Sequence, residues 1–202
     1  MDHWERFAVN QIFILGRPRQ IPDWGDYGDI LRHGMTSHLP RAGDHLQLER
    51  TGPFIPPVTF PGISDVVVTD MARRKIAGIL PNLRFRSLVK THIVKSNWDQ
   101  WNHTAREPAQ YPESGEPEDY ILAEPHDSLV AERLGELWEL VPDIVVGIQG
   151  KDGAIQMTQY RGQDFVRETL SAGYNFVSGR LRDALEAIAP DDVMLTLARR
   201  TE

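Results

Sequence analysis

Two segments of the chain resemble each other closely enough to limit the folds open to it. Residues 67–82 read VVTDMARRKIAGILPN, and residues 176–191 read FVSGRLRDALEAIAPD. At an offset of 109 residues the aligned pairs are Val68 and Val177, Thr69 and Ser178, Arg73 and Arg182, Ile76 and Leu185, Ile79 and Ile188, and Pro81 and Pro190. Each segment has a strand-like start, a Ser or Thr that can cap a helix, and a proline that stops the helix.

The similarity reflects either a duplication or a pattern shared by all strand–helix–strand units. Both explanations predict the same class of fold. We expect an α+β protein with a mixed, mainly antiparallel sheet, a few helices on one face, and two similar strand–helix–strand units. We also expect one domain over residues 1–202, in which a Pro- and Gly-rich segment, 1–62, is wrapped against an α+β core formed by 63–202.

Breakers and apolar spacing predict the remaining elements. Residues 16–62 hold seven prolines, and six glycines lie between Gly16 and Gly52, which favours packed loops and short edge strands. Apolar residues at helical spacing predict a helix from Ser128 to about Val141, ended by Pro142. A hairpin is predicted around Gly150-Lys151-Asp152-Gly153. Further strands are expected at 13–15, 66–69, 83–85, 88–94, 174–177 and 193–197, whereas 163–172 fits either strand or helix.

Composition excludes several classes of protein. The chain has no cysteine, which rules out disulfides, thiolate metal sites and a cysteine nucleophile. Its net charge of −7 argues against binding of nucleic acid or anionic lipid by the chain as a whole. Acidic Asp2 and Glu5 do not fit a signal peptide, and no apolar run is long enough for a membrane span. We therefore expect a cytoplasmic protein with no membrane partner.

Charge is strongly segregated along the chain. Residues 71–98 carry seven basic side chains and no acid, namely Arg73, Arg74, Lys75, Arg84, Arg86, Lys90 and Lys95. Residues 107–132 carry eight acids and no Lys or Arg, namely Glu107, Glu113, Glu116, Glu118, Asp119, Glu124, Asp127 and Glu132. Two solvated faces would explain the pattern. The alternative is that the acidic tract docks on a basic partner protein, with prolines keeping its loop stiff.

The predicted partner-binding residues follow from this alternative. They are the loop acids Glu113, Glu116, Glu118 and Asp119, the tryptophan Trp101, and the N-terminal group Asp23, Trp24, Asp26 and Asp29. Acidic side chains supply charge complementarity, and a tryptophan is a frequent anchor at interfaces. The basic tract with Trp98 and Trp101 could instead follow a phosphate backbone, although the acidity of the chain speaks against direct nucleic-acid binding.

No sequence motif of an enzyme is present. The chain lacks the serine-hydrolase elbow, the zinc-protease helix motif and both common phosphate-binding loops. We therefore expect no catalysis, no cofactor and no bound metal. The alternative is a small metal-dependent hydrolase or transferase that uses His33, Asp44 and His45, although their spacing does not place a ligand pair on one helix face.

Several stretches resemble one family. RTGPFIPPVTFPGISDVVVTDMARRKI, LRFRSLVKTHIVKSNWDQW, REPAQYPESGEPEDYILAEPH, GELWEL and FVSGRLRDALEAIAPDDVMLTLA are similar to immunity proteins of bacterial polymorphic toxin systems. The likeness covers about residues 50–200 and is nearest to the myxobacterial self-identity immunity family with two CXXCG motifs. Both motifs are missing here, where the chain has the DWGDYG and HGMTSHLP loops. The resemblance implies a non-catalytic protein that binds and blocks one cognate toxin, such as a nuclease.

Overall fold

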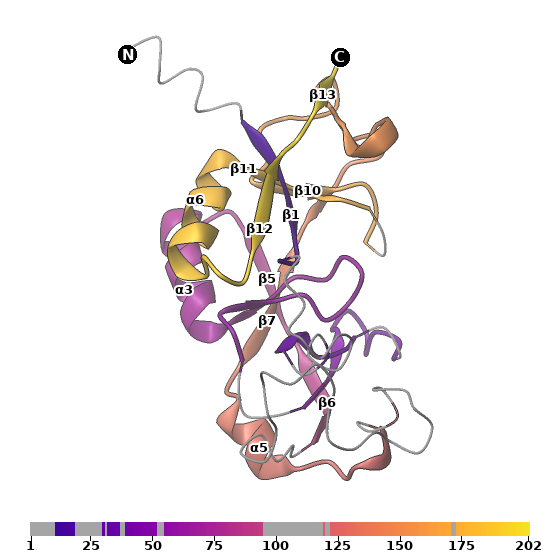
Figure 1. Cartoon of the computed structure of the whole chain (residues 1–202), viewed down its shortest axis with the longest axis vertical. Coiled ribbons are helices and arrows are strands. Elements are labelled where there is room, and N and C mark those ends of the chain that lie inside the picture. The colour runs from indigo at the N-terminus through magenta and orange to yellow at the C-terminus, as the bar shows by residue number, and fades with distance from the viewer. Residues whose placement is uncertain are drawn as a thin grey trace.

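The computed structural model describes residues 11–18, 30, 32–36, 39–51, 55–94, 119, 122–170 and 173–202. Figure 1 shows these residues as sheets with helices α3 and α6 side by side on one flank. The strands are β1 (Ile12–Gly16), β2 (Gln47–Thr51), β3 (Val58–Thr59), β4 (Val67–Thr69), β5 (Arg84–Ser87), β6 (Val89–Val94), β7 (Leu137–Val141), β8 (Asp143–Ile144), β9 (Ile155–Gln156), β10 (Phe165–Arg167), β11 (Asn175–Ser178), β12 (Met194–Leu197) and β13 (Arg200–Thr201). The helices are α3 (Asp70–Ile79), α5 (Ser128–Arg133), α6 (Gly179–Ile188) and the 3-10 turn η2 (Lys151–Gly153).

Two larger sheets form the centre of the molecule. One has the strand order β12-β1-β11-β10-β8 and the other the order β3-β4-β7-β5. All their pairs are antiparallel except β10 with β8. Two small parallel pairs, β2 with β6 and β9 with β13, flank them. The α+β class and the mainly antiparallel sheets predicted from the sequence are confirmed.

Helices α3 and α6 begin in the same way because their capping residues are equivalent. Thr69 Oγ1 accepts a hydrogen bond from the Ala72 amide at 3.3 Å, and Ser178 Oγ accepts one from the Leu181 amide at 3.2 Å. Each cap satisfies an amide that the first turn of a helix leaves without a partner. Both helices end two residues before the predicted proline stop. The two similar strand–helix–strand units are therefore confirmed.

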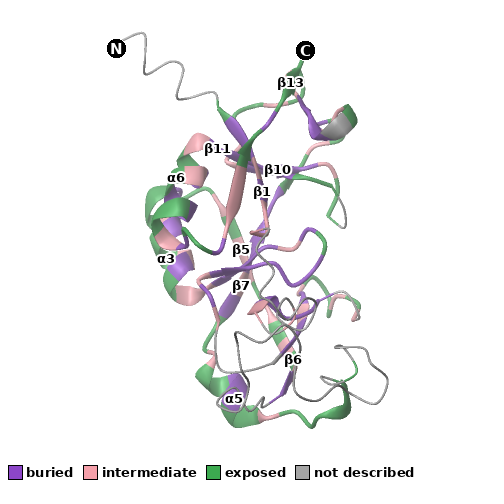
Figure 2. Cartoon of the chain, in the orientation of Figure 1, coloured by how far each residue is buried: buried purple, intermediate pink, exposed green. Residues whose placement is uncertain are grey.

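One apolar cluster joins the two larger sheets to both helices. It includes Leu15 and Val177 from one sheet, Val68 from the other, and Ile76 and Leu185 from the helices. Ile76 and Leu185 are both 0% exposed. Figure 2 shows this buried interior between the helices and the sheets. The apolar positions at helical spacing in α3 and α6 face this cluster, as amphipathic helices on a sheet require.

One prediction about the second half is wrong, and another holds only in part. The helix expected from Ser128 to about Val141 ends at Arg133, and Leu137–Val141 is strand β7. Gly135 has φ +63°, a left-handed conformation that ends helices and that glycine adopts without strain. The predicted hairpin around 150–153 is present but short: Gln149 and Ile155 form an antiparallel bridge, and the Gln156 amide donates to the Ile148 carbonyl at 2.8 Å. Its expected long arms do not pair with each other, because β8 pairs with β10 and β9 with β13.

Candidate functional site

Most of the residues predicted to contact a partner lie outside the described part of the chain. Asp119 is described, and it is exposed. The residues outside are Glu113, Glu116, Glu118, Trp101, Asp23, Trp24, Asp26 and Asp29. The structural description of the acidic tract therefore rests on Asp119 and on residues 122–132.

Three hydrogen bonds fasten the approach to helix α5 onto strand β6. The Asp127 amide donates to the Ile93 carbonyl at 2.6 Å, and the Ile93 amide donates to His126 Nδ1 at 3.0 Å. His92 Nε2 donates to the Glu124 carbonyl at 2.7 Å. Residues 124–127 are thus held along a strand, and their side chains are presented on a fixed backbone.

Helix α5 is short and depends on its surroundings. Six residues are too few for a stable isolated helix. Asp127 Oδ1 caps its first turn by accepting from the Val130 amide at 2.9 Å, and Val130 packs with buried Ile93. Lys90 Nζ donates to the carbonyls of Ala131 and Gly135 at the other end, where a cation suits the helix dipole.

The outward side of this segment combines apolar and acidic side chains. We define the α5 surface as the exposed residues Leu122, Glu124, Leu129, Glu132 and Glu136. Leu129 is 65% exposed and Leu122 is 47% exposed. Arg133 is also exposed here, so the local charge is mixed but mainly negative. Residues 122–136 thus expose both leucines and carboxylates, the kinds of side chain that supply the apolar and the polar contacts of protein interfaces.

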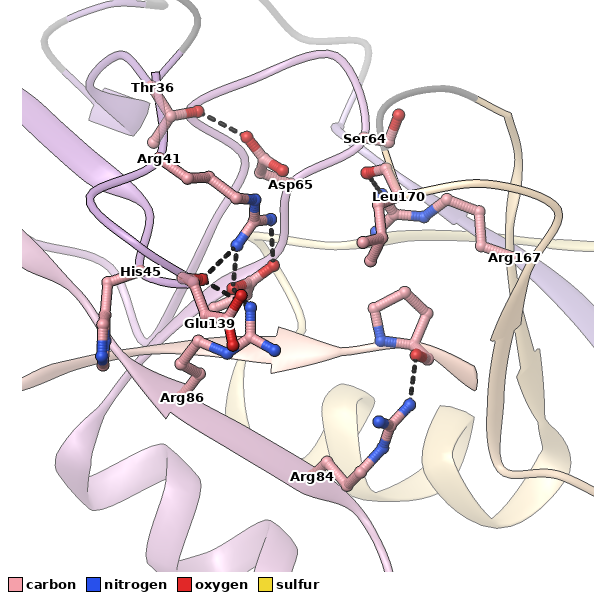
Figure 3. Close-up of polar contacts among 12 residues, drawn as sticks. Thr36, Arg41, His45, Ser64, Asp65, Arg84, Arg86, Glu139, Arg167 and Leu170 are labelled. Carbon is pink, nitrogen blue, oxygen red and sulfur yellow. Dashed lines mark hydrogen bonds and ion pairs between the residues drawn. The ribbon is translucent and has the colours of Figure 1, made fainter. Parts of the chain in front are cut away.

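A second polar constellation, which the sequence did not indicate, surrounds Glu139 of β7. Glu139 is 2% exposed. Arg41 donates to both of its carboxylate oxygens, at 2.9 Å and 2.7 Å, and Arg86 of β5 lies 3.8 Å away (Figure 3). The hydrogen bonds to Glu139 raise the pKa of Arg41 above its ordinary value. Arg41 and Arg86 also donate to the Asp44 carbonyl, at 2.8 Å and 2.5 Å.

This cluster is suited to positioning rather than to proton transfer. Two guanidinium groups occupy the Glu139 carboxylate, so it is not presented as a general base. By binding Asp44 as well, the same groups fix the exposed turn at 42–44 against strands β5 and β7. The arrangement joins two distant segments through buried charge and leaves a stiff turn at the surface.

A buried arginine lies beside this cluster. Arg167 of β10 is 2% exposed and donates to the Leu170 carbonyl at 2.7 Å (Figure 3). Burial lowers its pKa, and the charges of Asp65 and Glu139 partly oppose that effect.

Thr36 Oγ1 donates to Asp65 Oδ2 at 2.6 Å. A Cβ at Gly62 would lie 2.5 Å from that carboxylate oxygen and 2.6 Å from Thr36 Oγ1, so a larger residue there would displace this hydrogen-bonded pair.

Most of the described residues of the basic tract form ion pairs or hydrogen bonds within the chain. Arg73 and Arg74 both pair with Asp70, and Arg84 pairs with Asp143. Arg86 binds the Glu139 cluster, and Lys90 binds the end of α5. Lys75 is exposed on α3, whereas Lys95 lies outside the described residues. Such pairing gives little support to a continuous cationic surface for a polynucleotide.

His33, Asp44 and His45, the residues of the alternative metal-dependent enzyme, have other roles in the structure. His33 Nδ1 accepts from the Phe60 amide at 3.1 Å, and its ring meets the Phe60 ring edge-on. The His45 ring bonds the Ser87 carbonyl through Nδ1 at 2.7 Å, and Asp44 contributes its backbone carbonyl to two arginines. Within the described ranges, no three His, Asp or Glu side chains are grouped as a metal site would need.

Stability should fall in mild acid because of His33. Burial, reinforced by Arg17, Arg50 and Arg32, lowers its pKa to about 3 from 6.5. Between these values the unfolded chain binds more protons than the folded one, so the free energy of unfolding decreases as pH falls below about 6.5. We expect a loss of up to about 1.4 kcal/mol per pH unit. Urea unfolding at pH 7, 6 and 5 measures it.

The matched variant for this effect is His33→Gln, whose amide oxygen can still accept from the Phe60 amide. It should be less stable than the parent at pH 7 and lose less stability between pH 7 and pH 5. If the free energy of unfolding falls equally with pH in both proteins, groups other than His33 cause the acid sensitivity.

Comparisons with known proteins leave the family open. No family model matches the chain, and neither the curated proteins nor the solved structures contain a match. None of the helices in the described ranges is long and apolar enough to cross a membrane.

Proposed function

We propose that this chain is an immunity protein that binds one cognate bacterial toxin stoichiometrically and neutralises it. The observation that supports the proposal most directly is the α5 surface. It presents two exposed leucines among carboxylates, on a backbone that hydrogen bonds hold against β6. A surface ordered before binding loses less conformational entropy when the partner docks.

The chemistry of the α5 surface favours a basic protein as the partner. Acidic side chains speed the encounter with a basic surface and orient it, while the leucines can be buried on contact. A toxin that acts on nucleic acid has such a basic surface in its substrate cleft. The internal pairing of the basic tract and the likeness to immunity proteins are both consistent with this reading.

Co-expression with the toxin encoded by the adjacent gene tests the proposed function. We expect the chain to restore growth of cells that produce the toxin and to co-purify with it at a fixed ratio. If it neither restores growth nor co-purifies, the proposal is wrong.

The α5 surface can be tested separately by binding kinetics with the purified toxin. Leu129→Ala should weaken binding about ten-fold or more, mainly through faster dissociation. The double variant Glu124→Lys/Glu132→Lys should slow association on the order of ten-fold at low salt, with a smaller effect at high salt.

The controls change equally exposed residues elsewhere. They are Leu197→Ala on β12 and Asp183→Lys/Glu186→Lys on α6. If the controls weaken binding as much as the α5 variants, the α5 surface is not the interface. Reversal of Glu113, Glu116, Glu118 and Asp119 to lysine tests the rest of the acidic tract, and unchanged affinity would remove those four residues from the interface.

A further inference from the structure

The described elements fall into two series that follow the same order along the chain. The first series is β1, β2, β3, β4, α3, β5, β6, and the second is β7, β9, β10, β11, α6, β12, β13. Helix α5 lies between the series, and β8 is an addition to the second. The similarity of 67–82 to 176–191 is the part of this repetition that the sequence displays.

Each strand of the first series has neighbours that correspond to the neighbours of its counterpart in the second series. The order β3-β4-β7-β5 in one sheet matches β10-β11-β1-β12 in the other. The parallel pair β2–β6 matches the parallel pair β9–β13. A shared strand–helix–strand pattern would account for α3 and α6 with their flanking strands. It would not account for the four further pairs of counterparts, which are β1 and β7, β2 and β9, β3 and β10, and β6 and β13.

The register of pairing also repeats residue by residue. Val68 of β4 faces Trp138 of β7, and its counterpart Val177 of β11 faces Phe13 of β1. One cation–π contact is repeated as well. The Arg73 guanidinium lies 4.3 Å from the Trp138 ring centre, and the Arg182 guanidinium lies 4.6 Å from that of Phe13.

Backbone hydrogen bonds outside the ladders follow the same correspondence. The Thr69 amide donates to the Pro57 carbonyl at 3.1 Å, as the Ser178 amide does to the Asp164 carbonyl at 3.0 Å. The Leu88 amide donates to Leu137 at 3.1 Å, and its counterpart, the Ala198 amide, donates to Ile12 at 2.9 Å. The second pair of bonds links β7 to the first series and β1 to the second.

The two first strands are therefore exchanged between the halves. Strand β7 opens the second series but lies between β4 and β5 of the first. Strand β1 opens the first series but lies between β11 and β12 of the second. We infer that the chain is a tandem duplication with exchanged first strands, and that the slot between β11 and β12 accepts β1 from a second copy of the chain as well as from its own.

The slot is specific for a segment like β1. Both of its edges pair antiparallel with the inserted strand, so all five residues of β1 lie in ladders. Ile12, Phe13 and Leu15 are 1%, 8% and 3% exposed. An exchanged dimer would make these same contacts between two chains, so protein concentration decides which form prevails.

Strand β1 is freer to exchange than β7. Pro142 and β8 follow β7 directly, and α5 precedes it by three residues. In contrast, thirteen residues separate β1 from Ile30, the next residue beyond 17–18 that the structure describes. A connection of that length spans at most about 45 Å, so it restrains the position of β1 far less than the three residues before β7 restrain that strand.

The absence of native cysteine makes strand exchange directly measurable. Ile14 of β1 faces Thr196 of β12, and Ile14 is partly buried whereas Thr196 is exposed. Facing residues of an antiparallel pair have Cα atoms about 4.5–5.5 Å apart, within the range of a disulfide. Full-length Ile14→Cys and Thr196→Cys proteins are unfolded together, refolded at a series of concentrations, and oxidised.

We expect disulfide-linked heterodimer to increase with concentration, reaching at least several-fold the level given by Ile14→Cys with Thr201→Cys. Thr201 is an exposed threonine on β13, which pairs with β9 rather than with β1. Heterodimer no greater than this control at every concentration would overturn acceptance of β1 from a second copy.

The double variant Ile14→Cys/Thr196→Cys tests the slot itself. Refolded at high dilution, it should form an internal disulfide that mass spectrometry detects, and failure to do so would overturn the placement of β1 between β11 and β12. Neither result depends on the toxin, so this inference can fail while the proposed function stands.

Discussion

Replacing Glu139 by alanine should lower the free energy of unfolding by about 2–3 kcal/mol, because two partly buried guanidinium groups lose the carboxylate that they share. Arg41 would lose both hydrogen bonds to the carboxylate, and Arg86 would lose its nearest acid. The Glu139 side chain is 3% exposed, so water cannot readily replace it. Urea unfolding monitored by circular dichroism measures the change.

Two comparisons separate the buried charge from general damage to β7. The double variant Glu139→Leu/Arg41→Met should recover part of the loss, since it removes the Arg41 charge together with that of Glu139 and leaves only Arg86 without its acid. Disruption of the exposed pair formed by Arg84 and Asp143, through Arg84→Ala, should cost less than about 1 kcal/mol. A cost below 1 kcal/mol for Glu139→Ala as well would show that Arg41 and Arg86 find other partners.

The second large effect concerns the two helices. Ile76→Ala and Leu185→Ala remove equivalent side chains from the common apolar cluster, and each should cost about 2–5 kcal/mol. Because the cluster joins both sheets, either variant should shift one cooperative unfolding transition for the whole protein. Thermal unfolding followed by near- and far-ultraviolet circular dichroism tests this.

Exposed apolar residues provide the controls. Ile79→Ala at the end of α3 and Leu197→Ala on β12 change side chains that are 53% and 56% exposed, so each should cost less than about 1 kcal/mol. Two separate transitions in Leu185→Ala, one of them at the parental temperature, would mean that the halves unfold independently.

Local signals explain which elements could be predicted. The cap residues Thr69 and Ser178, the apolar spacing behind them and the two prolines all act within about ten residues, and both helices follow from them. Strand β7 was missed because Leu137 and Val141 also fit a helical stripe. The contrary signals were Gly135, which ends α5, and the nearly continuous apolar run of a central strand.

The polar cluster had no such local signal. Arg41 and Glu139 are 98 positions apart, and each resembles an ordinary surface residue in its own segment. Only the folded arrangement brings the turn at 42–44 to β7. For the α5 surface the sequence does show the acidic residues. It does not show the hydrogen bonds from β6 that hold their backbone in place.

By itself, the sequence determined that two similar strand–helix–strand units would form an α+β protein, because caps, apolar periodicity and breakers act between near neighbours. The tertiary structure decided which strand completes each sheet. Ile12 of β1 pairs with Ser178, far away along the chain, and Leu137 of β7 pairs with Thr69. In a repeated fold the alternation of apolar residues in β1 and β7 suits either position, the one between β4 and β5 or the one between β11 and β12. Only the packing of the whole chain therefore selects the exchanged arrangement.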